Sequence, residues 1–366
     1  MEKNMEKNNT YTTDGKVKHL SSEEDINTKL GKIIGKKFIE YRKTWDSANN
    51  FETVTDFPLF LHVDMNQTCN YKCPHCIIAY PEEVAGYYEG KYLGFEDFKK
   101  IVDEGSEYSC PSISPQGNNE PFLIKDLYKY IYYAHQKKFI DIMLNTNASA
   151  LTAKRSQEIL DSGLTRMRFS LDAFTKDTYE KVRVGGLPLD KVIRNIEIFL
   201  NLKEKGGYKL PVTGVSFVKM KQNEHELDDF IKFWKDKVDM VSIQTFTPPT
   251  RNVEKYKKFY ATEQLADSEP ITEFKCVQPF QRVVISNQTI APCCVNFNKD
   301  LTIGKLGIDT IHEAWHSKKM NEIRNLHKEG KFYLDKTCKD CVNLIYPNNK
   351  IPEARVTKGS VEVITD

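Results

Sequence analysis

Three cysteines lie close together, directly after an apolar segment of the chain. Cys69, Cys73 and Cys76 follow the run Leu59-Phe60-Leu61-His62-Val63. Thiolates this near in sequence can bind one metal centre, and three ligands leave a coordination position open. A structural zinc site normally has four ligands in two separated pairs, so this group does not indicate a finished zinc site.

A second group of cysteines lies towards the carboxyl end of the chain, at Cys276, Cys293, Cys294, Cys338 and Cys341. Four thiolates suit either a closed zinc site or a fully ligated iron–sulfur cluster. Spacing alone favours zinc. Because Cys293 and Cys294 are adjacent, the spacing leaves open which of them belongs to the set.

The overall composition limits the classes of partner and the compartment. Lys and Arg total 53 against 51 Asp and Glu, so we expect neither nucleic acid nor a membrane surface as a partner. There is no apolar run of the roughly 20 residues that a membrane span needs, and no signal peptide is recognisable. We therefore predict a cytoplasmic protein, whose nine cysteines are ligands or reactive thiols rather than disulfides. Cys110, ahead of a predicted strand, is expected to be a small buried apolar residue.

Strand and helix patterns alternate over residues 59–246. Apolar runs predict strands at 59–65, 112–116, 140–145, 165–171, 211–218 and 239–245. Helical patterns lie between them, near 95–107, 123–137, 152–162, 175–206 (broken at Gly185-Gly186) and 223–237. Such alternation predicts parallel strands with crossover helices. A complete eight-fold barrel takes about 250 residues, so we predict an α/β fold with a partial, open (β/α)6 barrel; a doubly wound sheet is the alternative.

The rest of the chain is expected to form smaller units around this barrel. Residues 1–27 are polar without a hydrophobic period, which predicts a disordered N-terminus. Apolar residues at helical spacing predict one amphipathic helix near 28–45, within a lead-in at 28–58. The remaining predicted units are a linker at 247–275, a small cysteine domain at 276–345, with a helix from Ile311 to about His327, and a C-terminal tail at 346–366.

Polar residues follow nearly every predicted strand at its carboxyl end. In parallel α/β architectures these ends meet at one rim, where ligands bind. The cysteine loop follows the first strand; the later polar groups are Gly117-Asn118-Asn119-Glu120-Pro121, Asn145-Thr146-Asn147, Ser170-Leu171-Asp172, Ser216 with Lys219, and Gln244-Thr245. Any one of these polar groups can be explained as an ordinary turn at the end of a strand. Because such groups follow one predicted strand after another, we predict a single active site at this rim.

The Cys69-x3-Cys73-x2-Cys76 motif resembles the signature of the radical S-adenosylmethionine (SAM) enzymes. This resemblance implies that the three cysteines hold a [4Fe-4S] cluster and that SAM occupies the fourth iron. Segment 117–121 resembles the family's Gly-Gly-Glu-Pro motif, which holds the amino group of SAM. Asn118 and Asn119 replace its glycine pair here, and Glu120 is retained.

The resemblance extends to further SAM-binding positions. His75 stands where the family usually places an aromatic residue against the adenine ring. Phe169-Ser170-Leu171-Asp172 resembles the fourth-strand motif, which implies that Ser170 and Asp172 belong to the SAM site. Arg183 is implied to meet the SAM carboxylate, a task that suits its planar fork. Asn147, after the third strand, is a further candidate at the rim.

The second cysteine group, following such a barrel, resembles the SPASM/twitch extension, which carries an auxiliary [4Fe-4S] cluster. The alignment implies Cys276, Cys293, Cys338 and Cys341 as ligands, in a single cluster of the shorter, twitch-like kind. Gln288 replaces a glycine of the extension, although Asn287-Gln288 can still turn a hairpin. Cys294 either replaces Cys293 as a ligand, packs beside the cluster, or donates a hydrogen atom to a substrate radical.

These resemblances imply a radical SAM enzyme, an oxidoreductase or epimerase. An electron from a flavodoxin- or ferredoxin-type donor would cleave SAM to methionine and a 5′-deoxyadenosyl radical, which removes a hydrogen atom from the substrate. We expect a carbohydrate or aminocyclitol-type small molecule, because the short lead-in leaves little room for a peptide-recognition domain. A peptide-modifying (RiPP maturase) enzyme is the alternative, and a zinc-stabilised binding protein is the rival of another class.

Overall fold

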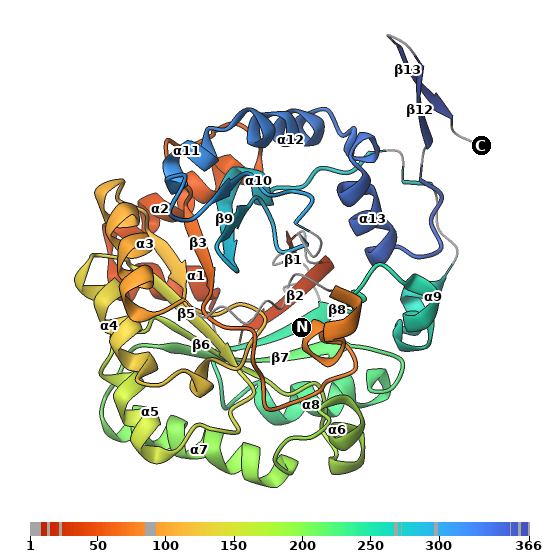
Figure 1. Cartoon of the computed structure of the whole chain (residues 1–366). Helices are drawn as coiled ribbons and strands as arrows, with labels where there is room; N and C mark the ends of the chain where they lie inside the picture. Colours follow the sequence, from red (N-terminus) through yellow and green to blue (C-terminus); the bar gives the residue numbers. More distant parts are fainter. Residues whose placement is uncertain are drawn as a thin grey trace.

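The computed structural model describes residues 9–12, 15–21, 24–84, 93–266, 270–271, 273–295, 299–351, 353–357 and 360–364. Within these residues the main sheet has the strand order β1-β2-β8-β7-β6-β5-β4-β3-β9-β10-β11. Its central strands are parallel neighbours: β3 (Phe60–Asp64), β4 (Ser112–Ser114), β5 (Asp141–Thr146), β6 (Arg166–Ser170), β7 (Val212–Lys219) and β8 (Met240–Thr245). Figure 1 shows this sheet curving, with the crossover helices on its outside. The predicted partial barrel is confirmed.

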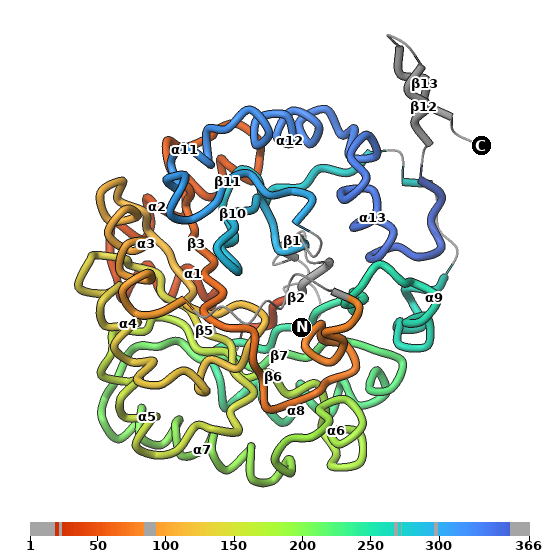
Figure 2. Tube along the Cα trace, viewed as in Figure 1, coloured from red at the N-terminus to blue at the C-terminus, as the bar shows by residue number. Residues whose placement is uncertain are grey.

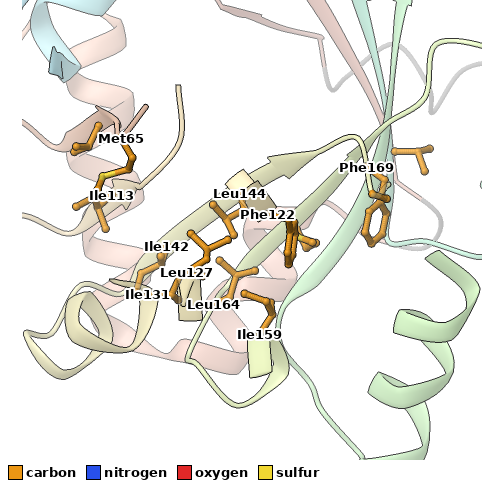
Figure 3. Close-up of a cluster of buried hydrophobic side chains, with 14 of the residues drawn as sticks. Met65, Ile113, Phe122, Leu127, Ile131, Ile142, Leu144, Ile159, Leu164 and Phe169 are labelled. Atoms are coloured by element: carbon orange, nitrogen blue, oxygen red, sulfur yellow. The ribbon is translucent and has the colours of Figure 1, made fainter. Parts of the chain in front are cut away.

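The crossover helices are α3 (Phe95–Glu107), α4 (Leu127–Gln136), α5 (Ala153–Leu160), α6 (Lys176–Val182), α7 (Leu189–Lys205) and α8 (Leu227–Trp234). Their apolar faces pack on the strands, as Figure 3 shows for Leu127 and Ile131 of α4 beside Ile142 of β5. Burying each side chain of this size contributes about 1.5–3 kcal/mol. The predicted break at Gly185-Gly186 separates α6 from α7, and Gly185 has a φ of 83°, which favours glycine.

The N-terminal region differs from the prediction. Two helices, α1 (Ile26–Ile34) and α2 (Lys36–Asn49), replace the single expected helix because Gly35 between them has a φ of 92°. Residues 1–27, expected to be disordered, contain β1 (Asn9–Thr12) and β2 (Gly15–Ser21), while 1–8, 13–14 and 22–23 lie outside the described residues. β2 pairs antiparallel with β8. β2 thereby satisfies the backbone hydrogen-bonding groups of β8, the edge strand of the barrel. No local sequence pattern predicts this pairing.

The cysteine domain continues the barrel sheet. Its elements are α10 (Gln278–Gln281), β9 (Arg282–Ser286), β10 (Thr289–Ala291), β11 (Gly304–Lys305), α11 (Ile311–Trp315), α12 (Lys318–Lys328) and α13 (Lys336–Ile345). β9 pairs in parallel with β3, and Figure 2 shows the two segments side by side. The φ angles of Asn287 and Gln288 are 47° and 62°, so the two residues turn the β9–β10 hairpin without glycine, as predicted. The helix expected from Ile311 to His327 is instead two helices, because the Ser317 side chain caps α12.

The predicted linker and tail also contain short elements. The linker includes α9 (Val253–Tyr256), and β12 (Glu353–Thr357) pairs with β13 (Ser360–Ile364) in the tail.

Short 3₁₀ turns occur along the described chain, at Ile77–Ala79, Pro81–Val84, Pro121–Leu123, Glu224–Glu226, Lys257–Phe259, Thr262–Leu265 and Phe332–Leu334. Among the described helices, none combines the length and apolarity needed to cross a bilayer.

Candidate functional site

The loop with the first three cysteines leaves the carboxyl end of β3 and is held by the α6–α7 connection. The Tyr71 hydroxyl lies 3.2 Å from that of Tyr179 and accepts a hydrogen bond from the Leu187 amide at 3.1 Å. A Cβ atom on Gly186 would lie 1.8 Å from the Tyr71 ring, so only glycine fits there. The Lys72 amide also donates to the Val184 carbonyl at 2.8 Å. One segment, far along the chain from the cysteines, therefore fixes this loop.

The three cysteines line one cavity of about 660 Å³ at the rim of the barrel. The predicted residues that share its wall are His75, Asn119, Glu120, Asn147, Ser170 and Arg183. Tyr71, Ile78, Gln116, Asn145 and Thr146 complete the lining. Asn118 and Asp172 are not among the lining residues. Gln116 was missed by the sequence prediction, although its position as the last residue of the strand predicted at 112–116 was an available signal.

Glu120 joins the loops that follow β4 and β5. Its Oε1 accepts hydrogen bonds from the Thr146 hydroxyl at 2.6 Å and the Phe122 amide at 3.1 Å. Its Oε2 accepts from the Asn147 amide at 2.8 Å. Burial raises the pKa of Glu120, and these donors offset part of that rise. Asn119 in turn donates to the Asn66 side chain at 3.0 Å, which connects the same wall to the loop after β3.

Asp172 is fully buried and contacts neighbouring side chains instead of lining the cavity. Its Oδ2 lies 2.5 Å from Arg183 Nη2 and 3.1 Å from His75 Nε2, and its Oδ1 accepts from the Val218 amide at 2.8 Å. Burial alone would raise its pKa, but the Arg183 charge and the His75 contact hold the pKa below the usual range. The carboxylate therefore positions two side chains that do line the cavity.

The cavity fits the cofactors that the motif implies. Burial raises the pKa of the Cys73 thiol to about 12, against the opposing charge of Arg183, whose Nη1 is 3.9 Å from the sulfur. A thiol that resists ionisation can still bind iron, because the metal replaces the proton of each ligand thiol. Arg183 Nε and His75 Nδ1 are buried and have no hydrogen-bond partner among the described residues, and both side chains line the cavity. Such unpaired groups fit a polar ligand bound beside the cluster.

A second cavity, of about 460 Å³, brings together four cysteines of the other group: Cys276, Cys293, Cys338 and Cys341. Burial raises the pKa of Cys338, and nearby Asp335 and the other three thiols raise it further. Cys294 is neither part of this lining nor among those charges. Four thiols that line one cavity fit a cluster whose irons are all bound by the protein.

His327 belongs to this second cavity and was missed from the sequence. It is 2 % exposed, and burial lowers its pKa to about 4, so the ring is neutral near pH 7. Its Nδ1 accepts from the Cys276 amide at 3.1 Å, which places the proton on Nε2, 3.5 Å from Cys338 Sγ. The ring therefore orients two of the four thiol residues, as outer-shell partners of metal ligands do.

Cys294 lines a separate cavity of about 310 Å³, together with Ser286, Asn287 and Cys293, so Cys293 borders both this cavity and the one with four cysteines. The Cys294 amide donates to Gln278 Oε1 at 3.3 Å, and Gln278 Nε2 lies 3.7 Å from the Cys294 sulfur. Ser286 donates to Asp64 Oδ2 at 3.1 Å, so this cavity adjoins the carboxyl end of β3. Cys110 is buried as predicted, with its thiol donating to the Ser112 carbonyl at 3.5 Å.

Two family models match the chain. The one for the radical SAM superfamily matches residues 63–233, and one for an iron–sulfur cluster-binding domain, SPASM, matches residues 276–342. The chain belongs to the radical SAM superfamily. This radical SAM protein carries its SPASM domain at the carboxyl side of the barrel, and its cofactors are SAM and [4Fe-4S] clusters. The domain boundaries at 59–246 and 276–345 remain predictions.

Individual relatives are distant. The GTP 3′,8-cyclase of Clostridium botulinum (strain Hall) is 27% identical over 206 residues, a match that covers 56% of this chain and 61% of the relative's length. Streptococcus suis SuiB bound to S-adenosylmethionine has a TM-score of 0.59 at 17% identity, covering 86% of this chain and 80% of SuiB. Native anSMEcpe with bound AdoMet has a TM-score of 0.53 at 16% identity, covering 80% and 88%. The two structural likenesses show the fold.

Proposed function

We propose that this radical SAM protein oxidises or epimerises a carbon of a carbohydrate or aminocyclitol-type small molecule. When bound, the reduced cluster and SAM supply a 5′-deoxyadenosyl radical that removes a hydrogen atom from that carbon. The observation that carries the proposal is the meeting of Cys69, Cys73 and Cys76 with polar rim residues in one cavity. An external flavodoxin- or ferredoxin-type protein is the proposed electron donor.

The proposed SAM site uses residues from three rim loops and from α6. Asn118, Asn119 and Glu120 hold the amino group, with the Glu120 carboxylate kept in place by its three donors. Arg183 contacts Asp172 through Nη2, and its Nε donates to the SAM carboxylate in the proposed complex. His75, Asn147 and Ser170 complete the proposed contacts around the cofactor. Asp172 is a positioning residue for Arg183 and His75.

Neutral amides in the cavity wall support a substrate rich in hydroxyl groups. Gln116 Oε1 accepts from the Asn145 amide at 3.1 Å and from its side chain at 3.0 Å. Asn145 Oδ1 accepts from Arg168 Nε at 2.7 Å, so the carboxamides are fixed before a substrate arrives. Pre-oriented amides of this kind bind hydroxyl groups in either direction, as donors or as acceptors.

The proposed auxiliary cluster, held by Cys276, Cys293, Cys338 and Cys341, would serve oxidation. When bound, that cluster would supply an electron acceptor, so that the substrate radical would lose one electron to it and one proton to solvent, leaving a carbonyl on a hydroxyl-bearing carbon. Epimerisation is a second candidate because Cys294 is not among the residues that line the auxiliary cavity and lines another cavity with Ser286, which hydrogen-bonds to Asp64 at the end of β3. The Cys294 thiol would return a hydrogen atom to the opposite face of the same carbon, breaking its S–H bond and leaving a thiyl radical. The external flavodoxin- or ferredoxin-type donor would supply one electron, and solvent one proton, to restore the thiol.

The test is anaerobic incubation of the iron-loaded protein with SAM and dithionite. A panel of sugars, aminocyclitols, peptides and GTP is screened for the compound that raises 5′-deoxyadenosine formation. The proposal expects a sugar or aminocyclitol to do so, and Cys73→Ala to abolish the product. A response only to peptides or GTP would refute the substrate class. A colourless protein with zinc and no iron would instead support the rival zinc-binding protein.

Turnover in deuterated water separates the two reactions. Epimerisation by Cys294 places deuterium on the inverted carbon and is lost in Cys294→Ala. Oxidation yields a carbonyl product, and Cys294→Ala leaves it intact. Cys110→Ala is the matched control, since this thiol is buried away from both cysteine cavities.

A further inference from the structure

Three potential metal ligands meet outside both cysteine sites. Asp56 lies in the lead-in to β3, whereas His312 belongs to α11 and His316 directly follows that helix. Their ligand atoms all lie within 4.8 Å of one another. His312 Nε2 is 3.2 Å from Asp56 Oδ1, and His316 Nε2 is 3.4 Å from the same oxygen. The chain thus places two imidazoles and one carboxylate around a common point.

These distances match a coordination shell. With zinc–ligand bonds of about 2.0–2.1 Å, neighbouring ligands of a tetrahedral ion are about 3.3 Å apart. The side chains of His312 and His316 are 31% and 40% exposed, and that of Asp56 is 76% exposed, so an ion can enter and water can complete its shell. Imidazole nitrogens suit zinc and other divalent transition metals better than they suit magnesium or calcium.

The two histidines are held in place before any ion binds. The His312 ring stacks on Tyr108 with centroids 4.6 Å apart and planes 12° from parallel. Tyr108 stacks on Phe57, next to Asp56, at 4.8 Å. The His316 amide donates to the His312 carbonyl at 3.1 Å, which keeps both rings one helical turn apart on the same side. This packing lowers the ordering cost of binding an ion.

The Asp56 segment is fixed to the same helix. Trp315 Nε1 donates to the Thr55 carbonyl at 2.7 Å, and the buried Trp315 ring anchors that bond. The His312 amide donates to Glu104 Oε1 at 2.9 Å, which brings a second carboxylate near the cluster. His316 Nε2 also lies 2.8 Å from the Asp56 carbonyl oxygen, a contact that this ring would exchange for the ion.

We propose that Asp56, His312 and His316 form a third metal site, which takes a divalent transition metal ion such as Zn²⁺. Asp56 precedes β3, so the site lies towards the amino end of that strand, whereas the cysteine loop leaves its carboxyl end. The ion joins the barrel's lead-in to α11 of the SPASM domain. Its role is therefore to fasten these two parts, separate from the radical chemistry.

The test uses the holoenzyme, because iron then occupies the cysteines that would otherwise capture zinc. Zn²⁺ is added anaerobically, unbound metal is removed, and zinc and iron are counted. Wild type should retain about one Zn²⁺ per chain with its iron unchanged. Either His312→Gln or His316→Gln should weaken zinc binding at least about tenfold, in line with the effect of disturbing metal-site residues. Asp56→Asn, at a highly exposed position, tests the carboxylate without endangering folding.

The matched control is His225→Gln, since His225 is also exposed and lies 3.8 Å from a single carboxylate, that of Glu226. It should retain zinc like wild type. Equal zinc retention in wild type and in the His312→Gln/His316→Gln double variant would overturn the proposal. So would zinc that enters only as iron leaves, because that outcome places it on the cysteines. Added zinc should also raise the thermal midpoint of the holoenzyme and fail to do so in the double variant.

Discussion

Asp172→Asn should destabilise the protein and weaken SAM binding together. Asn keeps the size of the side chain and an acceptor for the Val218 amide, but it removes the counter-charge of Arg183. Asp172 is 0% and Arg183 11% exposed, and removing one partner of such a buried pair costs about 3–5 kcal/mol. We expect the lower end, about 3 kcal/mol, because the ligand sulfur of Cys73 lies 3.9 Å from the same guanidinium.

The assay is thermal unfolding of the anaerobic holoenzyme, with SAM affinity measured on the same samples. A loss of about 3 kcal/mol corresponds to a fall of about 4 °C in the thermal midpoint for a chain of 366 residues. Asp177→Asn is the matched control, because Asp177 is an exposed first-turn residue of α6 and should change stability by less than about 0.5 kcal/mol. A second test is Asp172→Asn combined with Arg183→Met, which should cost less than the sum of the single changes. Additive effects, or a loss below about 1 kcal/mol for Asp172→Asn, would refute the reasoning.

Three further outcomes follow from the described contacts. Cys338→Ala should lower the iron content from about eight to about four atoms per chain, whereas Cys294→Ala should leave the iron content unchanged. Iron loss in Cys294→Ala would mean that Cys294, and not Cys293, is the auxiliary ligand. Gly186→Ala should displace Tyr71 at a cost of about 1–3 kcal/mol and lower iron retention, while Gly94→Ala, where a Cβ meets nothing within 4 Å, should retain iron. Burial and the charge of Arg168 lower the pKa of His19 to about 4. The unfolded chain therefore binds the extra proton as pH falls below about 6.5, and stability should drop by about 2 kcal/mol between pH 8 and pH 5. Denaturant unfolding of His19→Gln should lack this component; an unchanged pH dependence would mean that β2 does not bury His19 against β8.

Much of the barrel was predictable because its strands are short apolar runs separated by polar loops. The strand predicted at 165–171 is found at Arg166–Ser170, and the helix predicted at 95–107 is found at Phe95–Glu107. The α1–α2 break was missed because Gly35 ends a helix through its backbone angle, which a pattern of apolar residues does not record. The pairing of β2 with β8 depends on an edge more than 200 residues away, beyond the reach of a local pattern.

The candidate sites show the same limit. The cysteines and the rim residues were visible because their types and spacing are distinctive. The positioning role of Asp172 was not, because it depends on Arg183 and His75 approaching the same carboxylate. His327 gave no signal, since a histidine on an amphipathic helix is common and its importance comes from Cys276 and Cys338 lying against it. The distinction between Cys293 and Cys294 required knowing that Cys293 lines the cavity shared by four cysteines and that Cys294 does not.

The parallel pairing of β3 with β9 restricts how the enzyme can open. Five residue pairs, from Phe60↔Arg282 to Asp64↔Ser286, join the barrel's first strand to the SPASM hairpin. Rotating the SPASM domain away from the barrel at this point would break the hydrogen-bond ladder between β3 and β9, which opposes a hinge there. We expect the spacing between the two centres to stay constant through turnover, which makes the electron-transfer distance a fixed property of the sheet.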